Sequence, residues 1–412
     1  MLHFGIEIDL SQSKGKSVAH ILSTGSGIVL DLIRSGTATT RADLIESLGW
    51  SRITLAKRLD ELHAASLIVV AGQRDSGGGR PAEAFVVNKD AGLLLAVDIG
   101  GSHTRVGITD LVSRVLLEDE ADIGLSDGPD EVFAWALQVF DYLLKKLGKS
   151  RSDVWGIGVG VPGPVNSATG RLASPQIYEQ WDNVSVPSYF TSYFDAIIAV
   201  DRDVNILAIG EARLGWPEYN DLTVLKVGLG IGCGLVLDGN VYHGARGGAG
   251  DFSHGYRRGV EPCSCGRHGC LEAVASGYAI RRELNSRGYR VRTSADIVAL
   301  AAAGDPDTLS LLATAGAEIG AALVDVVGLL NPSAVVIGGN LAEAGEPFLG
   351  AIRASLMASV RDFSGLDLVV SPSRLGHKAG VLGASLIAQD ALFEPNRISH
   401  LTREQSQILR SP

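Results

Sequence analysis

Cysteine is scarce in this sequence, and both long apolar runs and a secretion signal are missing. Only 4 of the 412 residues are cysteine, and three of these lie between Cys263 and Cys270. No apolar run reaches the roughly 18 residues that a membrane span needs, and the N-terminus lacks the basic and apolar blocks of a signal peptide. We therefore expect a cytoplasmic protein that binds no membrane, with cysteines that are reduced or bound to a metal.

Positive charge is also too scarce for a protein that binds nucleic acid with its whole surface. The formal net charge is −10, which disfavours such binding. The charges are unevenly distributed, because residues 1–90 hold ten Lys and Arg against ten Asp and Glu. A neutral front end on an acidic body indicates two different partners, and 412 residues suggest two or three domains.

Residues 25–90 show the pattern of three short helices followed by two strands. Thr40 and Asp43 form a capping-box start for the second helix, and Ser51 can cap the third. Apolar runs before and after a glycine-rich loop indicate the two strands. This order predicts a winged helix-turn-helix domain over residues 25–90, preceded by a flexible arm at residues 1–24.

The third helix and the glycine-rich loop carry side chains that suit DNA. A short helix with a polar outer face fits the major groove, and a thin loop with two arginines fits the minor groove. A small protein-interaction domain with an ordinary charged face is the alternative. The candidate contacts to a double-stranded DNA operator are Arg52, Thr54, Lys57 and Arg58 on the helix and Arg74 and Arg80 in the loop.

The stretch from residue 250 to residue 272 gathers ligands for a metal ion. One imidazole and three thiols complete the tetrahedral shell of a structural zinc ion, whereas unrelated reduced thiols are the alternative. We expect His268 in the same stretch to be an exposed loop residue. The candidate ligands are His254, Cys263, Cys265 and Cys270, and the carboxylates of Asp251 and Glu272 bracket them.

Two glycine loops follow apolar strands in different halves of the body. A strand, a tight turn and a returning strand present backbone N–H groups to a phosphate, and Asp98 is suited to hold a metal-bound water. The candidate phosphate-loop residues are Asp98, Gly100, Gly101 and Ser102 in the first loop and Gly230 and Gly232 in the second, while a third turn carries Gly163. Two such loops with helices between them fit the two-lobed architecture of actin-like sugar kinases.

The order of these motifs resembles the ROK family of repressors, open reading frames and sugar kinases. Residues 263–272 are similar to its zinc signature C-x-C-G-x-x-G-C-x-E, and the loop after Asp98 is similar to its D-x-G-G-T loop. Asp251 and Ser253 depart from the pattern, because they replace the usual Glu and Gly. Further family stretches lie at 331–339 and 375–384, so the resemblance covers about residues 25–390.

The resemblance implies an α/β fold in which an N-terminal winged helix-turn-helix precedes a two-lobed, actin-like (ribonuclease H-like) sugar-kinase domain. Lobe 1 is expected at residues 91–200 together with a C-terminal helix at 385–412. Lobe 2 is expected at residues 201–384 and contains the zinc loop.

The resemblance also places Asp203 at the position of the family's catalytic base, beside several departures from a kinase. Arg202 replaces the sugar-binding Asn, Leu229 replaces a Thr of the second phosphate loop, and Asp251 is shorter than the usual Glu. Arg202 can pair with Asp203 and lower its basicity, bind an anionic ligand, or point to solvent. An eroded phosphate side beside retained sugar-side residues favours effector binding over catalysis.

The resemblance therefore implies a DNA-binding transcriptional regulator, a repressor, controlled by a sugar or sugar derivative. Helix-turn-helix proteins pair on palindromic sites, so a homodimer or a dimer of dimers is expected. An active ATP-dependent sugar kinase with a DNA-binding head, and a regulator whose cleft binds no ligand, are the alternatives. The candidate effector-binding residues are Arg202, Asp203, Asp251, His254, Glu272 and Gly163.

Overall fold

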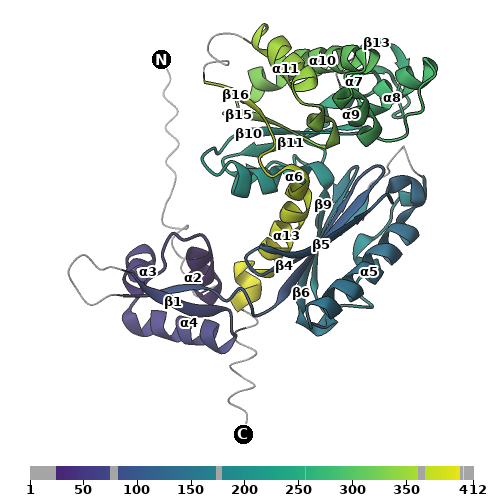
Figure 1. Cartoon of the computed structure of the whole chain (residues 1–412). Helices are drawn as coiled ribbons and strands as arrows, with labels where there is room; N and C mark the ends of the chain where they lie inside the picture. The colour runs from purple at the N-terminus through teal and green to yellow at the C-terminus, as the bar shows by residue number, and fades with distance from the viewer. Residues whose placement is uncertain are drawn as a thin grey trace, which may run out of the picture. The chain divides into compact units, whose positions relative to one another are not determined.

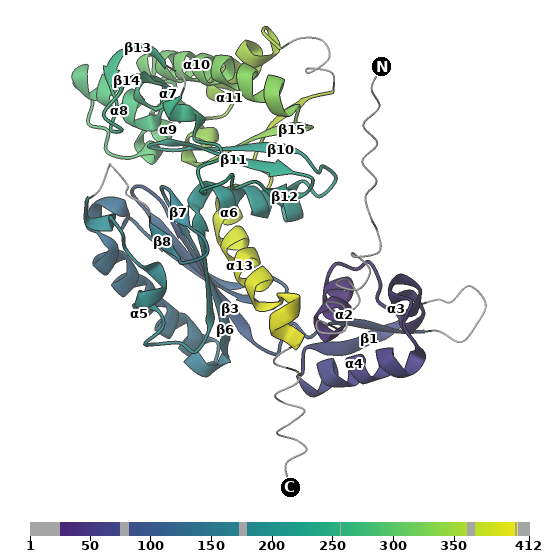
Figure 2. The ribbon, with the colours of Figure 1, turned by 180° about the vertical axis from the view of Figure 1, so that it is seen from behind.

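The computed structural model describes residues 25–74, 82–172, 179–255, 257–360, 367–399 and 402. They belong to two units, shown in Figures 1 and 2, and each unit draws on more than one segment of the chain. The first unit takes in the chain up to Leu93, Asp110–Val112 and the segment from Gln389 onward, and the second takes in Leu94–Thr109 and Ser113–Ala388. The arm expected at residues 1–24 and the loop residue Arg80 lie outside the described residues.

Three helices and a hairpin build the first unit. The helices are α2 (Gly25–Arg34), α3 (Arg41–Leu48) and α4 (Arg52–Ala64), and the antiparallel hairpin joins β1 (Ile68–Arg74) to β2 (Ala82–Val87). Thr40 and Asp43 form the expected capping box, and the Ser51 hydroxyl accepts a hydrogen bond from Thr54 N. Gly49 ends α3 in the left-handed region, with φ of 66°, where glycine meets no steric penalty.

The hydrophobic core of the first unit explains why these helices pack together. The residues that fill it are fully or almost fully buried: Val29, Leu30, Leu44, Leu55, Leu59, Leu62 and Phe85. The third helix contributes one buried leucine per turn from Leu55 to Leu62, which is the spacing of an amphipathic helix. The opposite face of α4 is therefore left for solvent or for a partner.

The end of the chain packs on the first helix of this unit. The Arg34 guanidinium lies 2.8 Å from an Asp390 oxygen, and Gly27 N donates to the Ser399 hydroxyl at 3.3 Å. A Cβ atom on Gly27 would come within 2.1 Å of the Pro395 carbonyl oxygen, so only glycine allows this approach. The C-terminal residues expected in lobe 1 thus divide: from Gln389 onward they group with the first unit.

Two five-stranded sheets of the same topology form the second unit. The orders are β5-β4-β3-β6-β9 and β12-β11-β10-β15-β16. Each sheet has a three-strand antiparallel meander followed by two parallel strands. The first sheet contains β3 (Leu93–Ile99), β4 (Thr104–Asp110), β5 (Val115–Ala121), β6 (Val154–Val161) and β9 (Ile197–Arg202). The second contains β10 (Leu222–Val227), β11 (Ile231–Leu237), β12 (Asn240–Val241), β15 (Ala334–Gly338) and β16 (Val369–Pro372).

Helices cover these sheets, and two of them lie between the sheets in both views (Figures 1 and 2). The pair is α6 (Asp203–Gly210) and α13 (Ala379–Leu392). The two helices approach so closely at Gly383 that a Cβ there would lie 1.6 Å from Ile206 O, and only glycine allows this contact. Ile206 packs with Ala96 of the first sheet, and Leu207 packs with Val224 of the second. The other helices are α5 (Pro129–Lys146), α7 (Leu271–Ala275), α8 (Gly277–Ser286), α9 (Ser294–Ala302), α10 (Pro306–Leu330) and α11 (Glu346–Met357).

The longest helix, α10, bears on the expectation that no apolar segment spans a membrane. By length and composition alone it is long and apolar enough to do so, and half of its most apolar window is buried inside the protein. Its Gly316 and Gly320 pack against the backbone of α11, and Glu318 interrupts the apolar run. A core helix has these properties.

The two sheets with their helices confirm the expected α/β fold.

Candidate functional site

A buried ammonium group joins the two sheets of the second unit. Lys226, on β10, places its Nζ atom 3.0 Å from an Asp98 oxygen and 3.0 Å from an Asp203 oxygen. Asp98 ends strand β3 of the other sheet, and Asp203 begins α6. All three side chains are less than one fifth exposed. Burial alone lowers the pKa of Lys226, but the charges of Asp203 and Asp98 outweigh it and raise that pKa, so the lysine is charged.

The sequence analysis placed Asp98 in the first phosphate loop and Asp203 among the effector-binding residues, and it missed Lys226, which contacts both. A signal was present, because this lysine interrupts an otherwise apolar strand whose residues Val224, Leu225 and Val227 are fully buried. A cation in such a strand requires a carboxylate partner. Which carboxylate it meets depends on a contact between two sheets, and no local pattern reveals that.

The two expected phosphate loops face each other. A Cβ on Gly101 would lie 3.9 Å from the Leu229 side chain of the second loop. In the first loop, Gly100 N donates to His103 O, and in the second, Gly228 N donates to Gly230 O. The side chain of Leu229 thus stands where a threonine would offer a hydroxyl. Ser102 is partly exposed in the first loop and Gly232 is partly exposed in the second.

Glu272 connects the second loop to the zinc stretch. Its Oε2 accepts a hydrogen bond from Ile231 N at 3.3 Å and lies 3.0 Å from the position of a Cβ on Gly230. Its Oε1 lies 3.9 Å from His254 Nε2. Asp251, by contrast, is exposed. Gly163 makes the turn after β6 with φ of 104°, which favours glycine.

Arg202 is buried and points toward the loop that precedes Asp251. Its Nη1 donates to Ala249 O at 2.7 Å, and its Nε is buried without a hydrogen-bond partner among the described residues. The residue is 9% exposed, so it does not point to solvent. Asp203 is paired with Lys226 rather than with this guanidinium.

A second polar group that the sequence analysis missed lies at the end of β9. Asp201 accepts hydrogen bonds from the Asn205 amide at 2.7 Å and from Arg202 N at 2.7 Å, and it lies 2.6 Å from His243 Nε2. The hydrogen bond to Asp201 raises the pKa of His243, although burial opposes the rise. This group holds the strand end that carries Arg202 in place.

Four side chains form a cluster that could hold a metal ion. The donor atoms of His254, Cys263, Cys265 and Cys270 all lie within 4.8 Å of one another. They come from a short turn, Phe252–His254, and from the hairpin of β13 (Arg257–Pro262) and β14 (His268–Cys270). His268 is exposed, as expected, and does not belong to the cluster.

The distances in this cluster suit tetrahedral zinc. With Zn–S near 2.3 Å and Zn–N near 2.0 Å, a tetrahedron separates two sulfurs by about 3.8 Å and a sulfur from a nitrogen by about 3.5 Å. The Sγ atoms of Cys265 and Cys270 are 3.6 Å apart, and Cys263 Sγ lies 3.5 Å from His254 Nδ1. The imidazole thus turns Nδ1 to the thiols and Nε2 toward Glu272, an outer carboxylate of the kind that orients metal-bound histidines.

On the first unit, the structure divides the expected DNA contacts. Arg52 and Lys57 are exposed on α4, and Thr54 is partly exposed. Arg58 instead lies 2.9 Å from a Glu61 oxygen, with a side chain only 17% exposed. Arg74 ends β1, and nothing is described of its side chain. Ile53 at the start of α4, which the sequence analysis did not name, is 85% exposed.

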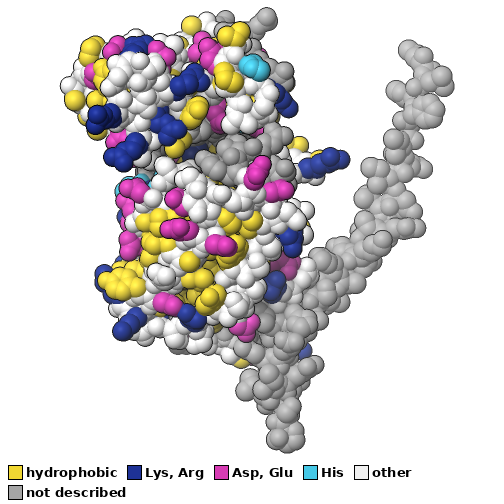
Figure 3. Space-filling view, turned by 90° about the vertical axis from the view of Figure 1, so that its right-hand side faces the viewer, with side chains coloured by type: hydrophobic (Ala, Val, Ile, Leu, Met, Phe, Trp, Pro, Cys, Tyr) yellow, Lys and Arg dark blue, Asp and Glu magenta, His cyan; other side chains and the backbone are white. Residues whose placement is uncertain are grey.

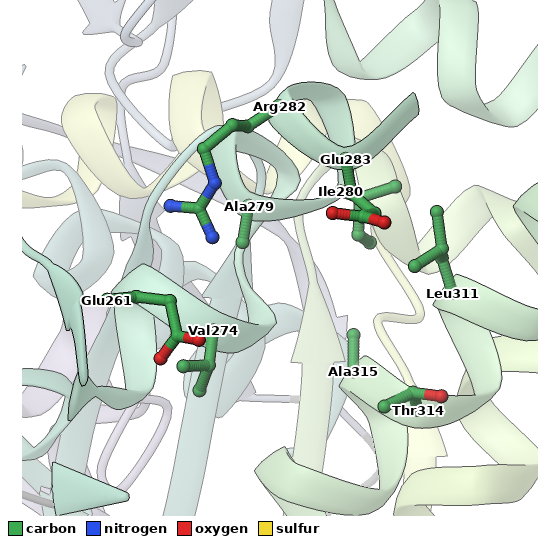
Figure 4. A pocket seen from close by; sticks show the side chains of 9 residues that line it. All are labelled: Glu261, Val274, Ala279, Ile280, Arg282, Glu283, Leu311, Thr314 and Ala315. Carbon is green, nitrogen blue, oxygen red and sulfur yellow. The ribbon is translucent and has the colours of Figure 1, made fainter. Parts of the chain in front are cut away.

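The surface away from the candidate site carries mixed charges and one pocket. Figure 3 shows Asp and Glu mixed with Lys, Arg and apolar side chains across one face, in keeping with the acidic net charge. A pocket of about 190 Å³ opens among β13, α7, α8 and α10, and it shares no residue with the candidate site (Figure 4). Its lining residues are Glu261, Val274, Ala279, Ile280, Arg282, Glu283, Leu311, Thr314 and Ala315.

The duplicated sheets, the facing glycine loops and the carboxylates between them define a protein with the two-lobed fold of actin-like sugar kinases, here with a helix-turn-helix unit. The ROK family matches residues 94–391, and the chain belongs to that family.

Three similar proteins illustrate the range of the family. A xylose repressor of Caldicellulosiruptor bescii is 27% identical over 387 residues, which cover 89% of this chain and 96% of the repressor. A glucokinase of Halalkalibacterium halodurans is 28% identical over 314 residues, which cover 72% of this chain and 94% of the glucokinase. The crystal structure of a ROK family transcriptional regulator, a homolog of the E. coli MLC protein, has a TM-score of 0.76 and 26% identity, covering 93% of this chain and all of the other.

Proposed function

We propose that this protein is a DNA-binding transcriptional regulator, a repressor, whose two-lobed body binds a sugar or sugar derivative. The observation that carries the proposal is the pairing of Asp203 with Lys226 at 3.0 Å in a chain that also has a helix-turn-helix unit. A catalytic base must be free to accept a proton from the substrate hydroxyl. An ammonium at contact distance stabilises the carboxylate and weakens it as a base.

The relatives support a regulator that is preserved along its whole length. The similarity to the xylose repressor covers 89% of this chain and 96% of that protein, whereas the similarity to the glucokinase covers 72% of this chain. A regulator needs both parts, because an effector acts on DNA binding only if it prefers one of two states of the protein.

The proposed DNA contacts come from the exposed start of α4. Lys57 and Arg52 would approach phosphates or base edges, and Ile53 would contact the methyl group of a thymine. Arg74 and Arg80 remain proposed minor-groove contacts. The regulator would act as a homodimer or a dimer of dimers on a palindromic operator.

The proposed effector site combines Asp203, His254 and Glu272 with Asp251, Gly163 and the buried Arg202. A structural zinc ion held by His254 and the three cysteines would fix this loop, since a saturated shell holds structure rather than activating water. Asp98, Gly100, Gly101, Ser102, Gly230 and Gly232 would form the vestigial phosphate side of the cleft.

Fluorescence anisotropy of a labelled DNA fragment from upstream of the gene tests the proposal. We expect nanomolar binding that falls steeply with salt and that changes when one member of a panel of sugars, sugar phosphates and sugar acids is added. No binding of specific DNA over random DNA, with or without sugars, would refute the regulator.

An active sugar kinase is the second candidate, because the glucokinase relative has a comparable identity, 28% against 27%, over the part of the chain that it covers. A coupled assay with ATP, Mg²⁺ and the same panel separates the two functions. Turnover at roughly 1–100 s⁻¹, the range of ordinary kinases, would establish the kinase. We expect no turnover above that of a heat-treated control.

A further inference from the structure

The position of Lys226 has a consequence for what the cleft can bind. The ammonium lies 3.0 Å from Asp98 and 3.0 Å from Asp203. Asp98 lies in β3 and Asp203 follows β9, both strands of the first sheet, so a lysine of the second sheet contacts two carboxylates of the first. Lys226 is the cationic member of this group, and β10 holds its backbone between β11 and β15. The lysine is therefore a fixed component of the site.

Phosphoryl transfer to a hydroxyl requires a metal-bound nucleotide and a carboxylate that accepts the proton. Oxygen ligands such as carboxylates are what Mg²⁺ and Mn²⁺ bind. Here one oxygen of each candidate carboxylate is already in contact with the ammonium, and the second oxygen of Asp203 accepts a hydrogen bond from Val204 N at 2.9 Å.

We propose that Lys226 is a resident cation that takes the place of a divalent metal ion between Asp98 and Asp203, so that the cleft binds its sugar effector without metal or nucleotide. The inference deepens the proposed function and rests on it, since it takes the cleft to be a binding site for an effector. A divalent ion that entered this space would sit at contact distance from an ammonium of the same sign, and that repulsion is strong in a buried site.

The lysine also compensates the negative charge of the two carboxylates. Two carboxylates buried side by side without a counter-ion repel each other and one would become protonated. With Lys226 between them both carboxylates have a counter-ion, and Asp203 can accept a hydrogen bond from a sugar hydroxyl. The lysine thus preserves the hydrogen-bonding side of the pocket while it removes the metal.

Titration of the full-length protein with Mn²⁺, followed by electron paramagnetic resonance, tests the inference. We expect no Mn²⁺ bound by the wild type and one Mn²⁺ per chain bound by Lys226→Met. The bound ion should disappear again in the double variant Asp98→Asn with Lys226→Met. Lys378→Met, which removes a lysine whose side chain is 48% exposed, is the matched control and should behave as the wild type.

Thermal unfolding with and without Mn²⁺ keeps the test decisive if Lys226→Met folds poorly. Removal of the ammonium leaves two uncompensated carboxylates, so Mn²⁺ should raise the melting temperature of this variant, or be required for its refolding, and leave the wild type unchanged. Mn²⁺ binding by the wild type at Asp98 would overturn the inference, and so would a Lys226→Met variant that gains no Mn²⁺ in either measurement.

These outcomes are separate from those of the proposed function. Mn²⁺ binding is read without DNA or sugar, so a failure of sugar to change DNA binding would refute the regulator while leaving the metal result standing. Conversely, an intact sugar response in the wild type together with wild-type binding of Mn²⁺ would refute only the role of Lys226.

Discussion

The Nζ atom of Lys226 lies 3.0 Å from a carboxylate oxygen of Asp203, and both side chains are largely buried. The pair links the first strand of the second sheet to the start of the helix that runs between the sheets. A buried ion pair contributes little net stability as a whole, yet removal of one partner leaves the other uncompensated. The pair therefore has a measurable role in folding as well as in binding.

Asp203→Asn should destabilise the protein by about 1–3 kcal/mol, because Lys226 keeps Asp98 as a second partner but loses one charge-assisted hydrogen bond. Urea unfolding followed by circular dichroism measures the change. Asp141→Asn is the matched control, since its partner Arg151 is 43% exposed, and a surface pair contributes about 0–1 kcal/mol. Equal effects of the two substitutions would contradict the assignment.

Loss of the proposed zinc ion should loosen the loop that carries His254. We expect one zinc ion per chain by elemental analysis, lost in Cys265→Ser and retained in Cys233→Ser, because the Cys233 thiol is buried on β11 outside the cluster. The response to sugar should disappear with the zinc, whereas DNA binding without sugar should persist. A zinc-free variant that still responds to sugar would show that the metal does not organise this site.

The start of α4 offers a test that separates apolar from charged contacts with DNA. Lys57→Ala should weaken binding to all sequences and reduce the slope of log K against log salt by about 1. Ile53→Ala should weaken binding to the operator by up to about 2.4 kcal/mol, because it removes three carbon groups that each contribute about 0.8 kcal/mol when buried, and should leave the salt slope unchanged. Lys145→Ala, on an exposed position of α5, should change neither quantity.

Arg58 illustrates the limit of a sequence-based assignment on this helix. Its spacing places it with the polar face, but its guanidinium pairs with Glu61, which also accepts a hydrogen bond from Ser26. Helical periodicity locates a side chain to within one turn and does not predict which neighbour it contacts. The caps at Thr40 and Ser51, which depend on residues three positions apart, were predicted correctly.

In the second unit, too, short-range patterns were predictable from the sequence, whereas contacts between distant residues were not. The strand that ends at Asp98 and the cluster of His254 with three cysteines are short-range patterns, and the structure has both. The partners of Lys226 and the contact of Asp201 with His243 join residues that are between about 20 and 130 positions apart. Only the assembled fold determines them.

Gly27→Ala should destabilise the first unit, because a Cβ there would meet the Pro395 backbone. Overpacking of this kind costs about 1–3 kcal/mol, and protease should then cut this unit at a lower temperature than it cuts the second. Gly328→Ala is the control, since nothing lies within 4 Å of that Cβ and alanine stabilises a helix by up to about 1 kcal/mol. Unchanged protection of α2 in Gly27→Ala would contradict the packing of the C-terminal segment.

The pair of His243 and Asp201 predicts a pH dependence of stability. The hydrogen bond to Asp201 raises the pKa of His243, while burial and the charge of Arg202 oppose the rise. A raised pKa in the folded state means that the stabilisation is complete below the unfolded value, about 6.5, and is lost as the pH rises through the folded value. The imidazole side chain is 39% exposed, so the contribution should stay below about 1 kcal/mol.

Urea unfolding of the wild type and of His243→Gln at pH 6 and at pH 8 measures this contribution. The wild type should be the more stable protein at pH 6, and the difference should shrink at pH 8, because glutamine does not titrate. His377→Gln, which removes an exposed imidazole, should leave the pH dependence of the wild type unchanged. A difference between wild type and His243→Gln that is the same at both pH values would mean that the hydrogen bond to Asp201 does not depend on protonation of His243.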